Sequence, residues 1–438
     1  MRIIATSAQK DAAMQLLNRR SKFQGETQNE LSAKVAAILS DIKNRGDHGL
    51  IDYTAKFDRV SITSDCLRVS TNEMAQAFAS VSEDFLTAIR QAKDNIIAFH
   101  QKQLTKDWLD IKEDGIILGQ RIQPVEAAGL YVPGGIAGST PLVSSVLMNA
   151  LPAVVAGVKR IIICTPPTAA GTINPYLLAT AMECNINEIY KVGGAQAIAA
   201  MAYGTESIKP VDVIVGPGNQ YVTEAKRQVF GFVGLDMLAG PSEILIIADD
   251  TANPAYIAAD LLSQAEHGPV NEAGSFLLTP SKTLAEAVSR EVENQISSLT
   301  RKGIAGASLE ANGGIIITND LEEAFELADF CGPEHMEILL NDPWSYLGMV
   351  KNAGAVFLGT YSTEPIGDYI AGTNHVLPTN GTARFASGLN VDHFIKKTSI
   401  ISYNHSGINK YGPAAMTIAE VEGLDAHAKA IKIRIDNN

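Results

Sequence analysis

Cysteine is scarce in this chain, with four residues among 438. They lie far apart and form no CxxC pair, so neither a thiolate zinc site nor a disulfide framework is indicated. Cys331 precedes Gly332-Pro333-Glu334-His335 and offers a thiol that could trap an aldehyde. A small residue of a loop or of the core is the favoured interpretation, because a buried thiol is usually inert.

Long apolar runs and excess positive charge are also missing. No run approaches the roughly 20 apolar residues of a membrane-spanning helix, and the start MRIIATSAQKDAAMQ has no apolar signal core. The 48 acidic and 35 basic side chains give a formal charge of -13, the wrong sign for binding nucleic acid or anionic lipid. We therefore expect a cytoplasmic protein without nucleic-acid or membrane partners.

What the sequence does contain is a change of pattern near residue 111. Before it, apolar residues recur at three- or four-residue spacing, as in 30–44, which indicates amphipathic helices. After it, short apolar runs alternate with helical stretches. The expected strands are Gly129-LYV, Arg160-IIIC, Glu188-IYKVG, Val211-DVIVG and Glu243-ILIIAD, then Ser275-FLLT, Gly314-IIIT, Met336-EILL and Ala355-VFLG.

This alternation predicts two α/β domains with largely parallel sheets that helices cover on both faces. After about residue 390 the pattern weakens into a loop-and-helix tail. The tail is too small to bury a core alone, so we expect it to dock on another surface, such as that of a second subunit.

Four segments carry residues suited to chemistry. A helix predicted over 253–266 carries Gln264 in its last turn, and His267 follows directly after it. The two residues lie one turn apart and can point at one object. From spacing alone, a solvated helix edge is the more common explanation. Glu334 and His335 adjoin a strand, where neighbouring side chains point to opposite sides and would need separate roles. A chance pair is equally compatible with this sequence.

The other two segments are loops. Gly367-DYIAGTNHVLP contains Asp368, an oxygen ligand, and His375, a donor or base. Glu422-GLDAH ends in His427 and resembles a surface turn. Together, Gln264, His267, Asp368 and His427 would form a nitrogen and oxygen ligand set suited to zinc with open positions, although such scattered ligands are a weak signal by themselves.

Three glycine-rich loops follow strands that are predicted between residues 111 and 244. They are Tyr131-VPGG, Gly193-GAQ and Gly216-PGNQY. Loops at one carboxyl edge make a ligand crevice plausible, but the last lacks the third glycine of GxGxxG, so the loops alone do not identify NAD.

Taken together, the ordered motifs resemble the histidinol dehydrogenase family over nearly the whole chain. They are Gly129-LYVPGG, Ser144-SVLMNALPA, Val192-GGAQAIAAMAYGT, Val215-GPGNQYVTEAKRQV, Asp236-MLAGPSEILIIAD, Leu262-SQAEHGP, Pro333-EHMEI and Gly367-DYIAGTNHVLPT. The resemblance implies a zinc-dependent oxidation of L-histidinol to L-histidine through L-histidinaldehyde, with reduction of two NAD, in the last steps of histidine biosynthesis.

The resemblance also implies residue roles. His335 matches the general base and Glu334 the carboxylate that activates water, while one zinc per subunit would contact the substrate. The matching positions are, for zinc, Gln264, His267, Asp368 and His427; for substrate, these four with Glu334, His335, Ser242, His375 and Glu422; and for NAD, Tyr131, Gln196 and Asn219. The stretch Gly135-IAGSTPLVSSV looks a few residues longer than the family's usual form.

The same resemblance implies a homodimer in which the C-terminal domain reaches into the partner's site. The expected fold is two Rossmann-like α/β domains with incomplete dinucleotide-binding folds and small helical terminal appendages. The expected boundaries are 1–23 for an N-terminal helical extension, 24–110 with 245–389 for the first α/β domain, 111–244 for the second, on the NAD side, and 390–438 for the C-terminal domain.

Three rival functions remain at this point. A zinc hydrolase would use the same ligands and Glu334 to activate water, without NAD. A cysteine-based aldehyde dehydrogenase would require Cys331. A catalytically silent binding protein is disfavoured because every matched ligand and both acid-base residues are present.

Overall fold

The computed structural model describes residues 1–19, 27–134, 141–267 and 272–436. Contacts between Cα atoms divide the chain into two units. The larger comprises Met1–Lys102 and Glu126–Phe394, and the smaller comprises Gln103–Val125 and Ile395–Asn438.

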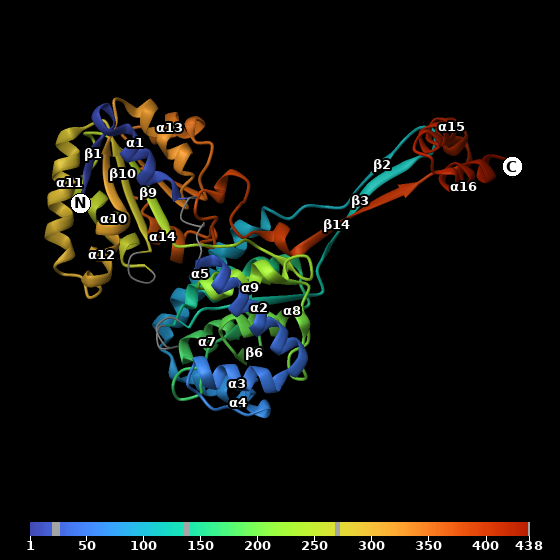
Figure 1. Ribbon diagram of the computed structural model, residues 1–438, viewed down its shortest axis with the longest axis horizontal. Helices are drawn as coiled ribbons and strands as arrows, with labels where there is room; N and C mark the ends of the chain where they lie inside the picture. The colour runs from blue at the N-terminus through green and yellow to red at the C-terminus, as the bar shows by residue number, and fades with distance from the viewer. Residues whose placement is uncertain (20–26, 135–140, 268–271, 437–438) are drawn as a thin grey trace. The chain divides into compact units, whose positions relative to one another are not determined.

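The larger unit contains a six-stranded parallel sheet (Figure 1). Its strands, in spatial order, are β1 (Ile3–Ala5), β11 (Gly313–Ile317), β10 (Gly274–Thr279), β9 (Glu243–Ala248), β12 (His335–Leu339) and β13 (Ala355–Leu358). Strand β9 lies near the middle and is buried throughout, which explains its unbroken apolar run in the sequence.

Alternate side chains of β9 enter two separate cores. Ile244 and Ile246 pack with the helices on one face, whereas Leu245 and Ile247 pack with those on the other. The first face is covered by α10 (Pro254–Ala265), α11 (Lys282–Ile296) and α12 (Lys302–Asn312), and the second by α1 (Thr6–Leu17) and α13 (Leu321–Cys331). The short α14 (Glu364–Tyr369) follows β13.

A second, five-stranded parallel sheet lies in the same unit. Its strands, in spatial order, are β6 (Glu188–Lys191), β5 (Arg160–Thr165), β4 (Ala127–Tyr131), β7 (Val213–Val215) and β8 (Gly234–Leu235). Its own helices are α6 (Val143–Ala156), α7 (Pro175–Glu183), α8 (Gly194–Tyr203) and α9 (Gln220–Val229). Two parallel α/β sheets confirm the expected fold class.

The N-terminal helices pack on the helices of this five-stranded sheet. Helix α2 (Thr27–Arg45) contacts α8 and α9, α4 (Thr71–Ser80) contacts α7, and α5 (Glu83–Gln101) contacts α6. The expected grouping of 24–110 with 245–389 stays a prediction. An amphipathic pattern shows that a helix buries one face but not which sheet that face covers.

The remaining short helices lie within the same unit. They are α3 (Asp47–Phe57) and the 3₁₀ segments η2 (Ser64–Cys66), η4 (Pro343–Met349), η5 (Thr382–Arg384) and η6 (Val391–Phe394).

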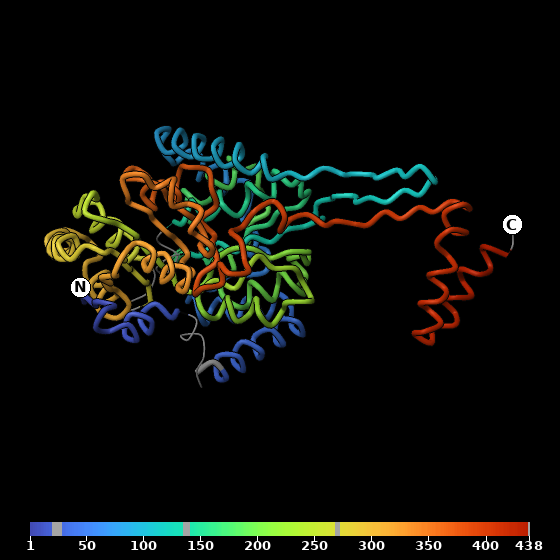
Figure 2. The backbone as a smooth tube through the Cα atoms, turned by 90° about the horizontal axis from the view of Figure 1, so that it is seen from above, coloured from blue at the N-terminus to red at the C-terminus, as the bar shows by residue number. Residues whose placement is uncertain are grey.

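The smaller unit joins two segments that are distant in sequence. Antiparallel strands β2 (Trp108–Ile111), β3 (Ile117–Pro124) and β14 (Ile395–Ser402) form a sheet with β3 in the centre. Helices α15 (His405–Val421) and α16 (Asp425–Asp436) lie side by side after it (Figures 1 and 2). The expected tail was helical, and the structure adds this sheet to it.

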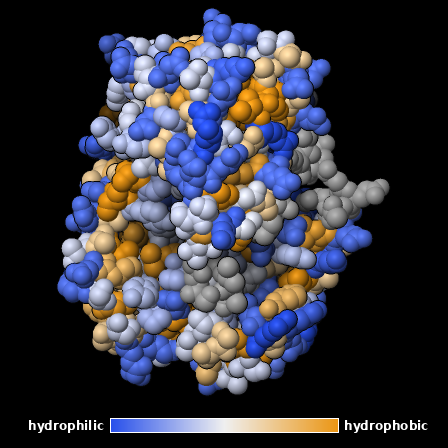
Figure 3. Space-filling model, turned by 90° about the vertical axis from the view of Figure 1, so that its left-hand side faces the viewer, coloured by the Kyte–Doolittle hydropathy of each residue, from blue (hydrophilic) through white to orange (hydrophobic). Residues whose placement is uncertain are grey.

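None of the helices within the described ranges is both long and apolar enough to cross a bilayer. In the space-filling view, apolar side chains occur in small groups between polar ones (Figure 3). Such scattering is usual for a folded chain, whose surface always includes apolar atoms.

Candidate active site

The candidate site lies where β9 and β12 of the six-stranded sheet begin. Glu243 and His335 open these two neighbouring parallel strands. Helix α10 follows β9 and returns along the sheet, so its last turn comes back to the same edge with Gln264 and, just beyond it, His267. Gln264 Nε2 lies 3.3 Å from His267 Nδ1, so the two side chains that share a predicted helix face do meet.

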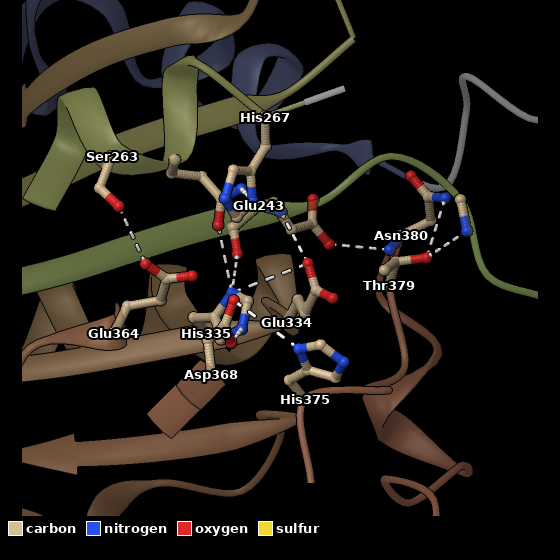
Figure 4. A network of polar contacts seen from close by, with 12 residues as sticks. Glu243, Ser263, His267, Glu334, His335, Glu364, Asp368, His375, Thr379 and Asn380 are labelled. Carbon is tan, nitrogen blue, oxygen red and sulfur yellow. Dashed lines mark hydrogen bonds and ion pairs between the residues drawn. The ribbon is translucent and has the colours of Figure 1, made fainter. Parts of the chain in front are cut away.

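The two ring nitrogens of His335 differ in their surroundings. The ring is 3% exposed, and Nδ1 lies 3.1 Å from the Glu243 carbonyl oxygen and 3.2 Å from Gln264 Oε1 (Figure 4). Two acceptors assign the hydrogen to Nδ1, whereas Nε2 has no hydrogen-bond partner among the described residues. Burial lowers the pKa of His335, so its neutral form offers a free lone pair at Nε2.

Glu334 is a buried carboxyl group beside this histidine. Its Oε2 accepts a hydrogen bond of 2.9 Å from the Glu243 backbone N–H and lies 3.7 Å from His335 Nδ1. Burial raises the pKa of Glu334 well above its usual range, and the carboxylates of Glu243, Asp368 and Glu364 add to the effect. Glu334 and His335, adjacent in sequence, are both fixed by the main chain of Glu243.

Three side chains in front of His335 form a group that could hold a metal ion. His267, Glu364 and Asp368 each have one ligand atom within 4.8 Å of those of the others. Asp368 Oδ1 also lies 3.8 Å from His335 Nε2. Burial, together with the neighbouring carboxyl group of Glu364, raises the pKa of Asp368 to about 9. Without a nearby cation, Asp368 therefore favours its protonated form.

Glu364 is a member of this group that the sequence did not predict. It opens the short helix α14 four residues before Asp368, so one helical turn brings the two carboxylates to the same side. The spacing Glu364-Pro-Ile-Gly-Asp368 was the available signal, but a six-residue helix leaves no recognisable periodicity in the sequence.

Two predicted substrate contacts lie nearby. His375 Nδ1 lies 3.9 Å from Asp368 Oδ2, and the buried Nε2 has no hydrogen-bond partner in the described chain. Burial lowers the pKa of His375 to about 3, helped by the adjacent histidines His335 and His267. Ser242 is half-buried directly before β9, where its carbonyl oxygen accepts from the Gly274 N–H at 3.0 Å.

The predicted NAD residues lie at the carboxyl ends of the five-stranded sheet. Tyr131 ends β4, and its hydroxyl accepts from the Gly194 N–H at 3.1 Å. Asn219 caps α9 by accepting from Tyr221 N–H at 3.0 Å. Gln196 is 1% exposed, and its Oε1 has no partner within the described ranges, so it is available to a ligand donor.

The loop after β7 requires glycine at position 216. The φ of Gly216 is +114°, and a Cβ there would lie 2.2 Å from the Tyr131 carbonyl oxygen, so a larger residue would not fit. The loop passes directly against the end of β4. Part of the stretch that looked unusually long, 135–140, lies outside the described residues, as does Gly268-Pro269 after His267.

Glu422 and His427 belong to the smaller unit. Glu422 is the C-cap of α15 and His427 lies in the first turn of α16, and both are exposed. Their predicted roles as a substrate contact and a metal ligand stay predictions.

Cys331 is excluded as a reactive thiol by its surroundings. It is 1% exposed within the core on the α13 side of the six-stranded sheet. Burial raises the pKa of this thiol well above its usual range, which suppresses the nucleophilic thiolate. The interpretation of Cys331 as a small core residue is confirmed.

The donor set fits zinc. An imidazole and two carboxyl groups converge without any thiolate, and Glu364 Oε1 is buried without a hydrogen-bond partner in the part of the chain that the structure describes. The amide oxygen of Gln264 lies 3.2 Å from His335 Nδ1, beside this group. Nitrogen and oxygen donors of this kind suit a catalytic zinc that keeps open positions for substrate.

Comparisons with known proteins extend over nearly the whole chain. The family model described as "Histidinol dehydrogenase" matches residues 21–435. A histidinol dehydrogenase of Geobacillus kaustophilus is 52% identical over 92% of this chain and 93% of its own length. One of Listeria monocytogenes is 51% identical over 95% and 96%. The crystal structure of histidinol dehydrogenase from Elizabethkingia anophelis has a TM-score of 0.91 and 42% identity, covering 100% of this chain and 98% of that one.

Proposed function

The chain belongs to the histidinol dehydrogenase family of NAD-dependent oxidoreductases in histidine biosynthesis, and we propose that it oxidises L-histidinol to L-histidine at the edge where β9 and β12 begin. The resemblance read from the sequence is thereby confirmed. The observation that carries the proposal is His335, whose Nδ1 is engaged by two acceptors while Nε2 has no hydrogen-bond partner among the described residues.

In the first half-reaction, His335 Nε2 takes the proton of the substrate hydroxyl while the carbinol carbon loses a hydride. A neutral, buried imidazole is suited to this role because its lone pair is held in one direction and its protonated form is disfavoured. NAD supplies the hydride acceptor in both half-reactions, and we assign Tyr131, Gln196 and Asn219 to holding it. The product of this half-reaction is the aldehyde.

In the second half-reaction, Glu334 takes a proton from water as the water oxygen bonds to the aldehyde carbon. The hydrate then loses a second hydride and a proton, which gives the carboxylate. Glu334 and His335 thus act in separate steps, although the Glu243 main chain fixes both. Two hydrides leave per substrate, so two NADH are formed.

We assign Gln264, His267 and Asp368 to holding one zinc per subunit, with His427 of a second subunit as a further ligand. The metal would bind the amine and imidazole nitrogens of histidinol and so orient the carbinol carbon. Ser242 and His375 are assigned to the substrate. Burial and proximity support His375, whose Nδ1 lies 3.9 Å from Asp368.

We also propose a homodimer in which Glu422 and His427 complete the site of the partner. Both side chains are exposed in the smaller unit and are therefore available to another surface. This unit is built from the two segments around β3 and β14 and carries little buried core of its own.

The test is to count NADH formed by the purified, zinc-loaded protein with L-histidinol and NAD, beside a sample treated with chelator. We expect two NADH per histidinol, loss of activity on chelation and recovery with zinc. Turnover of another substrate by zinc and Glu334 without NADH would instead identify a hydrolase. One NADH per substrate would contradict the four-electron scheme.

A further inference from the structure

Glu364 is a buried carboxylate that has no role in the proposed function. It is 1% exposed, and Oε2 accepts a hydrogen bond of 3.1 Å from Ser263 Oγ. The second oxygen, Oε1, is buried and has no hydrogen-bond partner among the residues that the structure describes. A buried carboxylate oxygen without a hydrogen-bond donor destabilises the folded state. We therefore expect a cation to bind this oxygen.

The surrounding elements fix Glu364 from several sides. Its backbone N–H donates to Glu337 Oε1 of β12 at 2.8 Å. The preceding residue, Thr363, donates through Oγ1 to Asp260 Oδ1 of α10 at 2.6 Å. With Ser263 also on α10, the start of α14 is anchored to both the strand and the helix that carry site residues. These hydrogen bonds therefore fix the position of Glu364.

Its position is beside the proposed metal ligands. Figure 4 shows Glu364 bound to Ser263 on one side, with the site of His335 and Asp368 on the other. Its ligand oxygen lies within 4.8 Å of those of His267 and Asp368. Two independent observations thus converge: the spacing of the three donors, and the absence of a hydrogen-bond partner for Oε1 among the described residues.

Charge gives the reason for a second carboxylate. Gln264 and His267 bind a metal as neutral donors, so Asp368 alone would leave a divalent cation with an excess positive charge in a buried place. An uncompensated buried charge is strongly unfavourable. A second carboxylate neutralises the cation, and Glu364 is the one placed to do so.

We propose that Glu364 is the second carboxylate of the metal site, facing the bound zinc with Oε1 and supplying the charge that Asp368 alone does not. This inference rests on the proposed zinc site and deepens it. It adds a fourth metal-facing residue from within one chain, so that most of the metal's binding energy would come from that chain itself.

The test measures zinc affinity rather than turnover. The full-length protein and the variant Glu364→Gln are equilibrated with zinc in chelator-buffered solutions, and bound zinc per subunit is determined by atomic emission. Glutamine keeps the shape and the acceptor for Ser263 but removes the charge. We expect zinc to bind about 10 to 100 times more weakly. Glu364→Ala, which leaves room for a water, replaces this variant if it does not fold and should show the same loss.

The matched control is Glu337→Gln, another buried glutamate in the same neighbourhood. Glu337 is not one of the three grouped donors, and the amide oxygen of the variant can still accept from the Glu364 N–H. Its zinc affinity should match that of the unmutated protein. Equal affinity of Glu364→Gln and the unmutated protein would overturn this inference alone, whereas an unmutated protein that binds no zinc would overturn the metal site and the inference together.

Discussion

Arg19 Nε lies 2.8 Å from Glu243 Oε2, and the two side chains are 1% and 0% exposed. Glu243 also accepts from the Asn380 N–H at 2.8 Å, and its main chain contacts both Glu334 and His335. The carboxylate that fixes the start of β9 is therefore neutralised by a residue close to the N-terminus. Arg19 thus supports Glu334 and His335, the proposed catalytic pair, without contacting either residue.

The first prediction concerns this ion pair. Arg19→Gln leaves the Glu243 carboxylate buried without its cation, so we expect the free energy of unfolding to fall by about 3–5 kcal/mol. Urea unfolding followed by circular dichroism measures it. The control is Arg45→Gln, which breaks exposed pairs with Asp41 and Asp52 and should cost less than about 1 kcal/mol. Equal losses for the two variants would contradict the role given to burial.

The second prediction separates Glu334 from His335. Glu334→Gln should slow oxidation of L-histidinaldehyde more than that of L-histidinol, because the amide cannot take a proton from water. The loss expected for a general base is about 10²–10⁴-fold. His335→Gln should slow the alcohol step by a similar factor. Rates are measured with each substrate separately, and equal loss of both half-reactions in Glu334→Gln would refute the hydration role.

The third prediction concerns the thiols. Cys66 is exposed, whereas Cys164, Cys184 and Cys331 are buried. A thiol-specific reagent should label one cysteine in the folded protein and all four after denaturation, because a buried thiol with a raised pKa is unreactive. Cys331→Ala should keep the kcat of the unmutated protein. A large loss of kcat in a folded variant would revive the cysteine-based mechanism.

The fourth prediction is a pH dependence of stability. Burial raises the pKa of Asp58 to about 6 from 3.8, and its Oδ2 has no hydrogen-bond partner within the described chain. The folded state thus holds the Asp58 proton more tightly than the unfolded state does. This contribution to stability is complete below the unfolded pKa and is lost as the pH rises through the folded pKa.

Asp58→Asn should therefore be more stable than the unmutated protein above about pH 7, by about 1 kcal/mol after allowing for solvent screening. The gain should shrink towards zero as the pH falls to about 4. Thermal melts across this range test it, with the exposed Asp94→Asn of α5 as the control. A gain that does not change with pH would assign the effect to something other than the charge.

The central strands and the last turn of α10 could be predicted because their residues obey simple rules. Buried parallel strands such as β9 are unbroken apolar runs, and Gln264 and His267 share a helix face by period alone. Glu334 and His335 were found by resemblance, since adjacency on a strand says little about function.

Other features depend on contacts that leave no mark in the sequence. Arg19 resembles any surface arginine until the sheet closes around Glu243. Strands β2 and β14 are largely exposed, so no alternation of apolar and polar residues marks them. Glu364 acquires its neighbours from β12 and α10, which are distant from it along the chain.

The edge strand β1 has a consequence for the order of events during synthesis. Residues 3–5 pair with residues 315–317 of β11, so this segment is synthesised long before the strand that it pairs with. Arg19 is likewise synthesised long before Glu243. Chains that stall before β11 should therefore keep an unpaired N-terminal segment and a sheet open at one edge, which is the form most exposed to aggregation and to chaperones.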